Sequence, residues 1–220
     1  MWKARSDLSN KLLYAKEAWM KLLNIVLLTL ISFSGFAYSN NDFESVTVGL
    51  KITKPADWQF VSAQDNLENL KRVEHGSPEL KAAMLKYATA PLVVMAKYPE
   101  PYDDLNPSIK VNLKPLGKLD GNNPSKILNL ILPQFKKSFQ DFELVQKPVE
   151  TTIAGLKASY MRLNYSLSIP DGRSFPTTSE LWIVPRGDFF FMIGSGTRQD
   201  ETTGSRKEVK DILNTLVVRK

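Results

Sequence analysis

The segment from residue 98 to 107 holds the densest group of side chains with chemical potential in this chain. Its carboxylates and its asparagine offer oxygen atoms of the kind that calcium prefers, but their spacing does not match the EF-hand loop. Two tyrosines among several prolines favour a rigid loop that presents aromatic rings instead. We therefore predict a binding loop without a metal ion, with the candidate binding residues Tyr98, Glu100, Tyr102, Asp103, Asp104 and Asn106.

The residues available for catalysis are few. The chain has one histidine, His75, and no cysteine, so a zinc site built on several histidine or cysteine ligands is excluded. A Ser-His-Asp arrangement would have to use His75, which we place at the exposed end of a polar helix. Only carboxylate pairs remain for a reaction such as glycoside hydrolysis. We predict no catalytic residues, no metal and no cofactor.

Three short motifs have simpler structural explanations. Arg186-Gly-Asp188 spells an integrin-recognition tripeptide, but glycine and aspartate are also what a hairpin turn selects. Asn164-Tyr-Ser166 fits the glycosylation pattern but falls inside a predicted strand. Gly194-Ser-Gly196 lacks the lysine of a phosphate-binding loop, and we expect its glycines to let the chain leave a strand.

The most apolar stretch, Met20 to Asp42, has the three parts of a secretory signal. Lys21 supplies the positive charge, residues 22–33 the apolar region, and Ala37-Tyr-Ser39 the small residues of a cleavage site. The apolar region is too short to cross a bilayer, which needs about 20 residues. We predict cleavage after Ser39, no stable membrane span afterwards, and a periplasmic or secreted protein.

The domain boundaries follow from this signal. Residues 1–19 are interpreted as a mis-annotated or extended N-terminus, with Met20 as the initiator; a cytoplasmic helix before an uncleaved anchor is the alternative. Residues 20–39 form the signal peptide, and 40–220 form one domain, which is large enough to bury a core without disulfides. Residues 1–39 carry five basic and two acidic residues, so their removal lowers the formal charge from +6 to +3. We therefore expect no nucleic-acid partner.

The first half of this domain mixes strands and helices. Alternation over residues 46–52 predicts a strand that ends at the Lys54–Trp58 corner, and two helical stretches follow within residues 66–87. Residues 91–96 and 108–113 read as further strands. Ser125 is the expected cap of a helix with an apolar stripe to Phe139, in which Pro133 should cause a kink or a split.

The second half predicts a meander and a closing helix. Residues 158–169 and 177–184 read as strands joined by the turn at 170–173, and a third strand begins at Phe189. Ser205 and Glu208 fit a capping box before a helix whose buried stripe is Val209, Ile212, Leu213 and Leu216. Because the strand at Phe189 is apolar on both faces, helices should cover both sides of the sheet.

The order of these features resembles the PsbP-like superfamily, which groups photosystem extrinsic proteins, Ran-binding Mog-type proteins and exported bacterial proteins of the DcrB type. The resemblance rests on the strand and Pro-x-x-Trp corner of residues 50–58, "NPSIKVNL" at 106–113, "IAGLKASYMRLNY" at 153–165, and the meander and helix that end in "ILNTLVV". It covers most of residues 46–218. The helical stretch at about 66–87 departs from the simplest form of the family.

This resemblance implies an α+β fold, an α/β/α sandwich around a central antiparallel sheet. It implies no shared enzymatic activity, because the superfamily looks like a set of binding and assembly accessories, and it carries no site residues onto this chain. We therefore expect a non-enzymatic binding or assembly accessory of the cell envelope with a protein partner. The alternatives are a carrier of a small apolar ligand and a hydrolase that relies on carboxylates alone.

Overall fold

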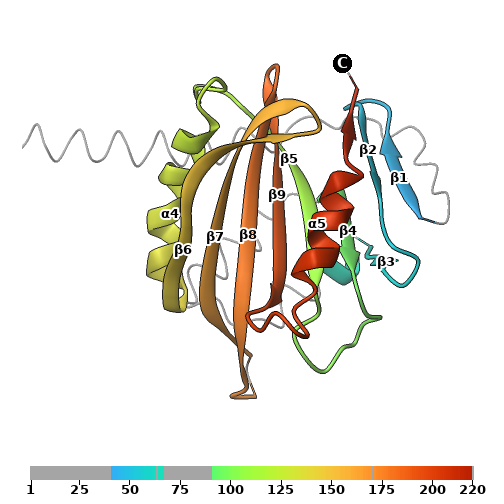
Figure 1. The fold of residues 1–220 in the computed structure, drawn as a ribbon, viewed down its shortest axis with the longest axis vertical. Helices are drawn as coiled ribbons and strands as arrows, with labels where there is room; N and C mark the ends of the chain where they lie inside the picture. The colour runs from blue at the N-terminus through green and yellow to red at the C-terminus, as the bar shows by residue number, and fades with distance from the viewer. Residues whose placement is uncertain (1–40, 63, 67–90, 170, 220) are drawn as a thin grey trace, which may run out of the picture. The chain divides into compact units, whose positions relative to one another are not determined.

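The computed structural model describes residues 41–62, 64–66, 91–169 and 171–219. Within these residues, a seven-stranded and a three-stranded antiparallel sheet pack with two helices (Figure 1). The larger sheet has the strand order β3 (Gln59–Phe60), β4 (Val93–Ala96), β5 (Ser108–Pro115), β9 (Phe189–Arg198), β8 (Ser174–Arg186), β7 (Leu156–Ser168) and β6 (Gln140–Ile153). The smaller sheet has the order β1 (Asp42–Ser45), β2 (Leu50–Thr53) and β10 (Val217–Val218).

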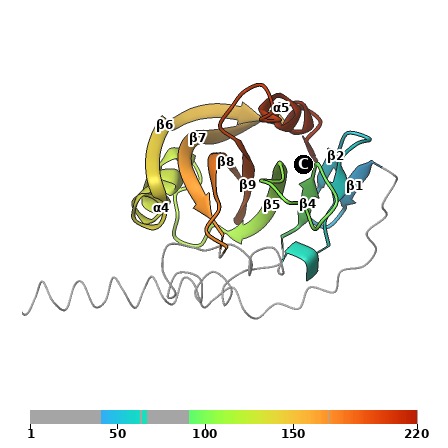
Figure 2. The same cartoon turned by 90° about the horizontal axis from the view of Figure 1, so that it is seen from below.

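The larger sheet is covered on both faces. On β8, Trp182 and Val184 belong to a core cluster that includes α5 (Arg206–Asn214) and the smaller sheet. Leu181 and Ile183, which alternate with them, belong to a second cluster with α4 (Pro124–Ser138). Figure 2 shows α4 beside β6 and β7, and α5 near the smaller sheet. The predicted α+β fold, with helices on both faces of an antiparallel sheet, is therefore confirmed.

The meander of the second half is also confirmed and is longer than predicted. β7 and β8 pair from Ser159 with Ile183 to Ser168 with Ser174, and β8 and β9 pair from Thr177 to Arg186. A further strand, β6, which the sequence analysis did not predict, pairs with β7 across three irregularities in register. These irregularities and the charged residues of β6 are typical of an edge strand.

The strand predicted over residues 46–52 is wrong in its first half. The chain instead forms a hairpin of β1 and β2, and residues 46–49 are its turn, closed by the amide of Gly49, which donates to the carbonyl of Val46 at 3.2 Å. Gly49 has a φ of +64°, which a residue with a side chain rarely adopts. Val46 is consequently 81% exposed, although it continues the alternating pattern.

Three local expectations are also wrong. The helix α4 begins at Pro124 after Asn123 rather than after Ser125. It continues through Pro133, which excludes the expected split, while the alternative of a kink stays a prediction. The strand β9 continues through Gly194 and Gly196 to Arg198, because these residues pair with both β5 and β8. Val209, Ile212 and Leu213 form the buried stripe of α5 as predicted, whereas Leu216 is buried but lies beyond the helix end at Asn214. Ser205 makes no capping hydrogen bond with its side chain.

Several predictions fall outside the described residues. These are the signal peptide with its cleavage after Ser39, the helical stretches within residues 67–87, and His75. In the part of the chain that the structure covers, no helix is both long and apolar enough to span a bilayer.

Candidate functional site

The candidate site is the connection between β4 and β5, residues 97–107, which we call the 97–107 loop. Its base is closed where the amide of Lys97 donates to the carbonyl of Pro107 at 2.9 Å, so the two strands enter and leave side by side. The Lys97 ammonium also donates to Ser205 at 3.1 Å and to the Glu208 carboxylate at 2.8 Å. These contacts attach the base of the loop to the first turn of α5.

The same contacts explain why the predicted capping box is absent. Ser205 and Glu208 both bind Lys97 instead of each other's backbone amides. The hydrogen bond that Lys97 donates to Glu208, together with the carboxylate's charge, raises the pKa of Lys97 against the opposing effect of burial. Ser205 and Glu208 therefore link α5 to the 97–107 loop through Lys97 instead of capping the helix.

Asn106 fixes the shape of the loop from inside. Its side-chain oxygen accepts from the amide of Tyr98 at 3.0 Å, and its side-chain nitrogen donates to the carbonyl of Tyr98 at 2.9 Å. The same nitrogen donates to Glu100 at 2.8 Å, and Glu100 accepts from the amide of Tyr102 at 3.1 Å. Four of the six predicted binding residues are therefore joined in one hydrogen-bonded unit.

The two tyrosines form a stacked pair at the tip of this unit. Their ring centroids lie 4.4 Å apart with an angle of 17° between the planes. Tyr102 is the more outward of the two, with 37% of its surface exposed. Partial burial raises the pKa of Tyr102, and Tyr98 and Asp104 add to this effect, so its hydroxyl stays neutral at ordinary pH. The loop thus presents a rigid aromatic face with a hydroxyl group.

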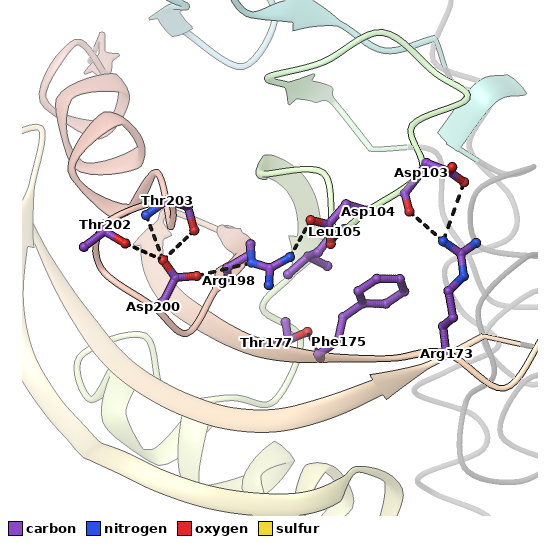
Figure 3. A network of polar contacts seen from close by, with 10 residues as sticks. All are labelled: Asp103, Asp104, Leu105, Arg173, Phe175, Thr177, Arg198, Asp200, Thr202 and Thr203. Carbon is purple, nitrogen blue, oxygen red and sulfur yellow. Dashed lines mark hydrogen bonds and ion pairs between the residues drawn. The ribbon is translucent and has the colours of Figure 1, made fainter.

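Two arginines hold the loop from outside (Figure 3). Arg198, at the end of β9, forms an ion pair with Asp104 and a second with Asp200 at 3.2 Å. Arg173, before β8, donates to the carbonyl of Asp103 at 2.8 Å and lies 3.6 Å from its carboxylate. Arginine suits this role because its guanidinium group can bond two acceptors at once.

The turn after β9 keeps Arg198 in place. One oxygen of Asp200 accepts from the hydroxyls of Thr202 and Thr203 and from the Thr203 amide, and its other oxygen accepts from Arg198. These donors, above all Thr203, hold the pKa of Asp200 well below its usual range. Asp200 is therefore a carboxylate at all ordinary pH values and continues to orient Arg198.

The structure divides the predicted binding residues into two groups. Glu100, Asp104 and Asn106 have their side chains engaged in holding the loop, and Tyr98 supports the ring of Tyr102. Tyr102 and Asp103 face outward, and the Asp103 side chain is fully exposed. The first group is suited to positioning and the second to contact with a partner.

Sequence reasoning missed both arginines. Arg198 lies 94 residues from Asp104, and Arg173 lies 70 residues from Asp103. No local spacing connects them, since only the pairing of β5, β9 and β8 brings the strand ends together. Among the described residues, no group of three or more histidine, cysteine, aspartate or glutamate side chains is arranged to hold a metal ion.

The residues of the Arg186-Gly-Asp188 and Asn164-Tyr-Ser166 motifs make structural contacts. Arg186 donates to the carbonyls of Val48 and Arg219, which attaches the turn after β8 to the smaller sheet, and Gly187 takes the positive φ of the turn. Asn164 lies within β7 and donates to Glu143 on β6. Neither motif is displayed as a free recognition segment.

Comparison with known proteins shows that the fold of this chain resembles that of solved structures. No protein-family model matches the chain, and no curated protein matches it significantly by sequence. The solved structure of LpqN from Mycobacterium tuberculosis, described as involved in cell envelope biogenesis, matches with a TM-score of 0.50 and 17% identity, over 78% of this chain and 83% of LpqN. At this identity, the match shows the fold alone.

Two further matches are more distant. Cyanobacterial PsbP from Synechocystis has a TM-score of 0.43 and 13% identity, over 87% of this chain and all of that one. The Ran-binding protein Mog1p of Saccharomyces cerevisiae has a TM-score of 0.43 and 14% identity, over 83% and 96%. Photosystem extrinsic proteins and Mog-type proteins are two of the three groups named by the sequence resemblance.

Proposed function

We propose that this chain is an exported, non-enzymatic accessory protein of the cell envelope that binds a protein partner through Tyr102 and Asp103. The observation that carries the proposal is the contrast within the 97–107 loop: these two residues face solvent, while their neighbours hold the loop from both sides. A contact surface that is already ordered loses little conformational entropy on binding. Tyrosine is also among the residue types enriched where binding energy is concentrated.

The compartment is supported by the sequence of residues 20–39, which has the parts of a secretory signal. The likeness of fold to LpqN, a protein described as involved in cell envelope biogenesis, is consistent with an envelope role. The proposal includes cleavage after Ser39, so the mature protein begins at Asn40. Mass spectrometry of the protein isolated from its own compartment tests this, and an intact N-terminus on a membrane-bound species would contradict it.

The two alternative functions have less support among the described residues. A carrier of an apolar ligand would need space between the sheet and its helices, but side chains of the two core clusters occupy both layers. A hydrolase would need two cooperating carboxylates, whereas Asp103 and Asp104 are turned to different arginines (Figure 3). Neither alternative has an observation of its own in its favour.

Photo-cross-linking in cells tests the binding surface directly. A photoreactive amino acid is placed at position 102 of the full chain, and a matched one at Leu130, which is 55% exposed on α4. We expect one discrete cross-linked partner from position 102 and none of the same mass from position 130. The double variant Tyr102→Ala and Asp103→Asn, with the new photoreactive group at Pro101, should lose that partner.

Two outcomes overturn the assignment. One is that positions 102 and 130 capture the same set of proteins, which would indicate random collision. The other is that the double variant keeps every partner that the unaltered loop binds. The Tyr102 ring packs on Tyr98 and the Asp103 carboxylate lies beside Arg173, so urea unfolding of the double variant should show a loss of about 1 kcal/mol. Its circular dichroism should match that of the parent chain.

A further inference from the structure

A second group of polar residues crosses the larger sheet on the face that α5 covers. Pairing between strands aligns Arg162 on β7, Glu180 on β8 and Ser195 on β9 in one row. The adjacent row holds Asn164, Thr178 and Thr197. We call these six residues the polar rows. On β8 and β9 they alternate in step with Trp182 and Ile193, which belong to the core cluster of α5, so they lie on its face.

Glu180 is the centre of these rows. Glu180 is only 7% exposed, and its carboxylate accepts a hydrogen bond from the hydroxyl of Tyr160 at 2.5 Å. Arg206, the first residue of α5, donates to the same oxygen at 3.4 Å. Burial and the bond to Glu180 raise the pKa of Tyr160, which therefore remains a donor. One buried carboxylate is thus held by a tyrosine and an arginine.

The rows contain more hydrogen-bonding groups than the described protein satisfies. Buried atoms without a partner are Arg162 Nε, Arg206 Nε, Ser195 Oγ and Thr197 Oγ1. They are four of the five such side-chain atoms among the described residues, the fifth being Trp58 Nε1. Since about nine in ten buried polar groups in folded proteins are satisfied, this concentration calls for hydrogen-bond partners from outside the described protein, either water or a ligand.

The charges in the rows point to a negatively charged acceptor. Arg162 has no ion pair or side-chain hydrogen bond with any described residue, and Arg206 shares the carboxylate of Glu180 with Tyr160. The register places Arg162 opposite Glu180, so two arginines adjoin one buried carboxylate. The further carboxylate that bonds either of them among the described residues is that of the exposed Glu201. Both nitrogen atoms without partners are donors only, so the occupant must supply acceptor oxygens.

An exposed side chain already takes part of this role. Glu201, whose side chain is 82% exposed, accepts from Arg206 at 2.9 Å. A pair this exposed contributes little to stability, and an incoming anion with better geometry displaces it. The Arg206 side chain is itself 25% exposed, so a ligand reaches the guanidinium group from solvent without unfolding α5.

We infer that the polar rows bind a small oxyanion, a carboxylate or phosphoryl group, between the guanidinium groups of Arg162 and Arg206. Ser195 and Thr197 lie on β9, across β8 from Arg162, and Glu180 with Tyr160 orients Arg206. Planar guanidinium groups bond carboxylate and phosphoryl oxygens in pairs, which accounts for two arginines at one position. The site is separate from the 97–107 loop and does not depend on the partner proposed there.

Nuclear magnetic resonance of the arginine Nε–H groups tests this inference on the full chain. Inorganic phosphate and, separately, acetate are titrated at constant ionic strength against chloride. We expect the signals of Arg162 and Arg206 to shift and saturate with one of the two anions. Saturation with phosphate assigns a phosphoryl ligand, and saturation with acetate assigns a carboxylate ligand; both outcomes support the site.

Three variants make the test specific. Arg162→Lys keeps the charge but loses the paired donors, and it should weaken anion binding about tenfold. Glu201→Gln removes the competing carboxylate and should strengthen binding by up to about fivefold. Arg173→Lys, just before β8 and in contact with the 97–107 loop, should leave anion binding unchanged.

The inference fails if neither anion gives saturable shifts, or if chloride alone gives the same shifts, since buried water or simple screening would then account for the rows. It also fails if Arg162→Lys binds as tightly as the parent chain. The opposite signs expected for Arg162→Lys and Glu201→Gln exclude general loss of structure as an explanation. Urea unfolding of both variants checks that they are folded.

Discussion

The 97–107 loop and the polar rows both bring arginines and carboxylates together, but they differ in how completely these groups are paired. In the loop, Arg198 and Arg173 bond acceptors on the chain itself, and Asn106 makes contacts with both its oxygen and its nitrogen. In the rows, Arg162 and two hydroxyls retain unpaired buried atoms, and so does Arg206 of α5, which bonds Glu180.

This difference indicates different roles for similar residues. A satisfied network is rigid and can fix the position of the groups it does not use, which in the loop are Tyr102 and Asp103. An unsatisfied network carries a cost in stability that an external ligand can remove. The loop is thus suited to present a surface, and the rows are suited to receive a ligand.

The largest loss of stability is expected from a substitution at Glu180, the centre of the polar rows. Glu180→Ala removes the buried carboxylate that Tyr160 and Arg206 both bond, so it should lower the free energy of unfolding by about 3 kcal/mol. Urea unfolding followed by tryptophan fluorescence measures this. The matched control, Glu150→Ala, breaks an exposed ion pair with Lys157 and should change stability by less than about 1 kcal/mol. Equal effects would contradict the central role of Glu180.

The next effect tests the interior of the loop. Asn106→Ala removes three hydrogen bonds that join Tyr98 and Glu100 to the end of the loop, and should lower stability by about 2 kcal/mol. Hydrogen exchange should become faster at the amides of Tyr98 and Tyr102. The exposed Asn122 provides a control, since Asn122→Ala should leave these amides unchanged. Unaltered exchange in Asn106→Ala would show that the loop is not held from inside.

A matched pair of buried serines tests the difference in pairing most directly. Ser159, on β7, contacts Ser125 at 2.8 Å and donates to the carbonyl of Val149 at 3.1 Å, whereas Ser195 has no partner. Ser159→Ala should therefore lower stability by about 1 kcal/mol. Ser195→Ala should leave stability unchanged or raise it by up to about 1 kcal/mol, since an unpaired buried hydroxyl is removed. Both values come from urea unfolding, and a loss for Ser195→Ala equal to that of Ser159→Ala would show that its hydroxyl is satisfied.

The smallest effect concerns pH at the outer anchor of the loop. The pKa of Asp200 is lowered by folding, so its contribution is present above the unfolded pKa of about 3.9 and is lost as the pH falls through the folded value. The turn at residues 198–203 should therefore be unchanged at neutral pH and loosen only in strong acid. Carbon NMR of the Asp200 carboxyl measures the titration.

The source of this shift can be tested separately. Thr203→Val removes the hydroxyl with the largest influence on Asp200, so the pKa of Asp200 should rise toward the ordinary aspartate value. Its ion pair with Arg198 remains in this variant, which separates the two causes. A titration identical to that of the parent chain would show that Thr203 does not determine the shift.

Much of the fold could be predicted because it depends on neighbours in the sequence. The alternation of Met161, Leu163 and Tyr165 requires one buried strand face, and the structure buries all three. The same rule failed at Val46 and Val48, where Gly49 and the preceding β1 convert an alternating segment into a turn. Period-two alternation describes a possible strand, but pairing with another segment decides whether the strand forms.

The aromatic loop could be predicted from the sequence, but the roles of its side chains could not, and that the loop binds a partner stays a prediction. Prolines and tyrosines between Tyr98 and Pro107 indicated a rigid aromatic loop, and the structure places a stacked tyrosine pair there. That Asp103 faces solvent while Asp104 pairs with Arg198 could not be read from two adjacent identical residues. The capping box predicted from Ser205 and Glu208 is absent because both residues bond Lys97, which lies more than a hundred residues away in the sequence.

The sequence by itself determined the apolar strand faces, the meander of β7 to β9, the buried stripe of α5 and the absence of cysteine chemistry, since each depends on composition or on local periodicity. Only the tertiary structure decided which charges meet. The register of β7, β8 and β9 sets Arg162, Glu180 and Ser195 in one row, and the order of β5, β9 and β8 brings two arginines to the 97–107 loop. The physical reason is range: side-chain periodicity acts over a few residues, whereas ion pairs and shared hydrogen bonds depend on strands whose positions only the complete fold establishes.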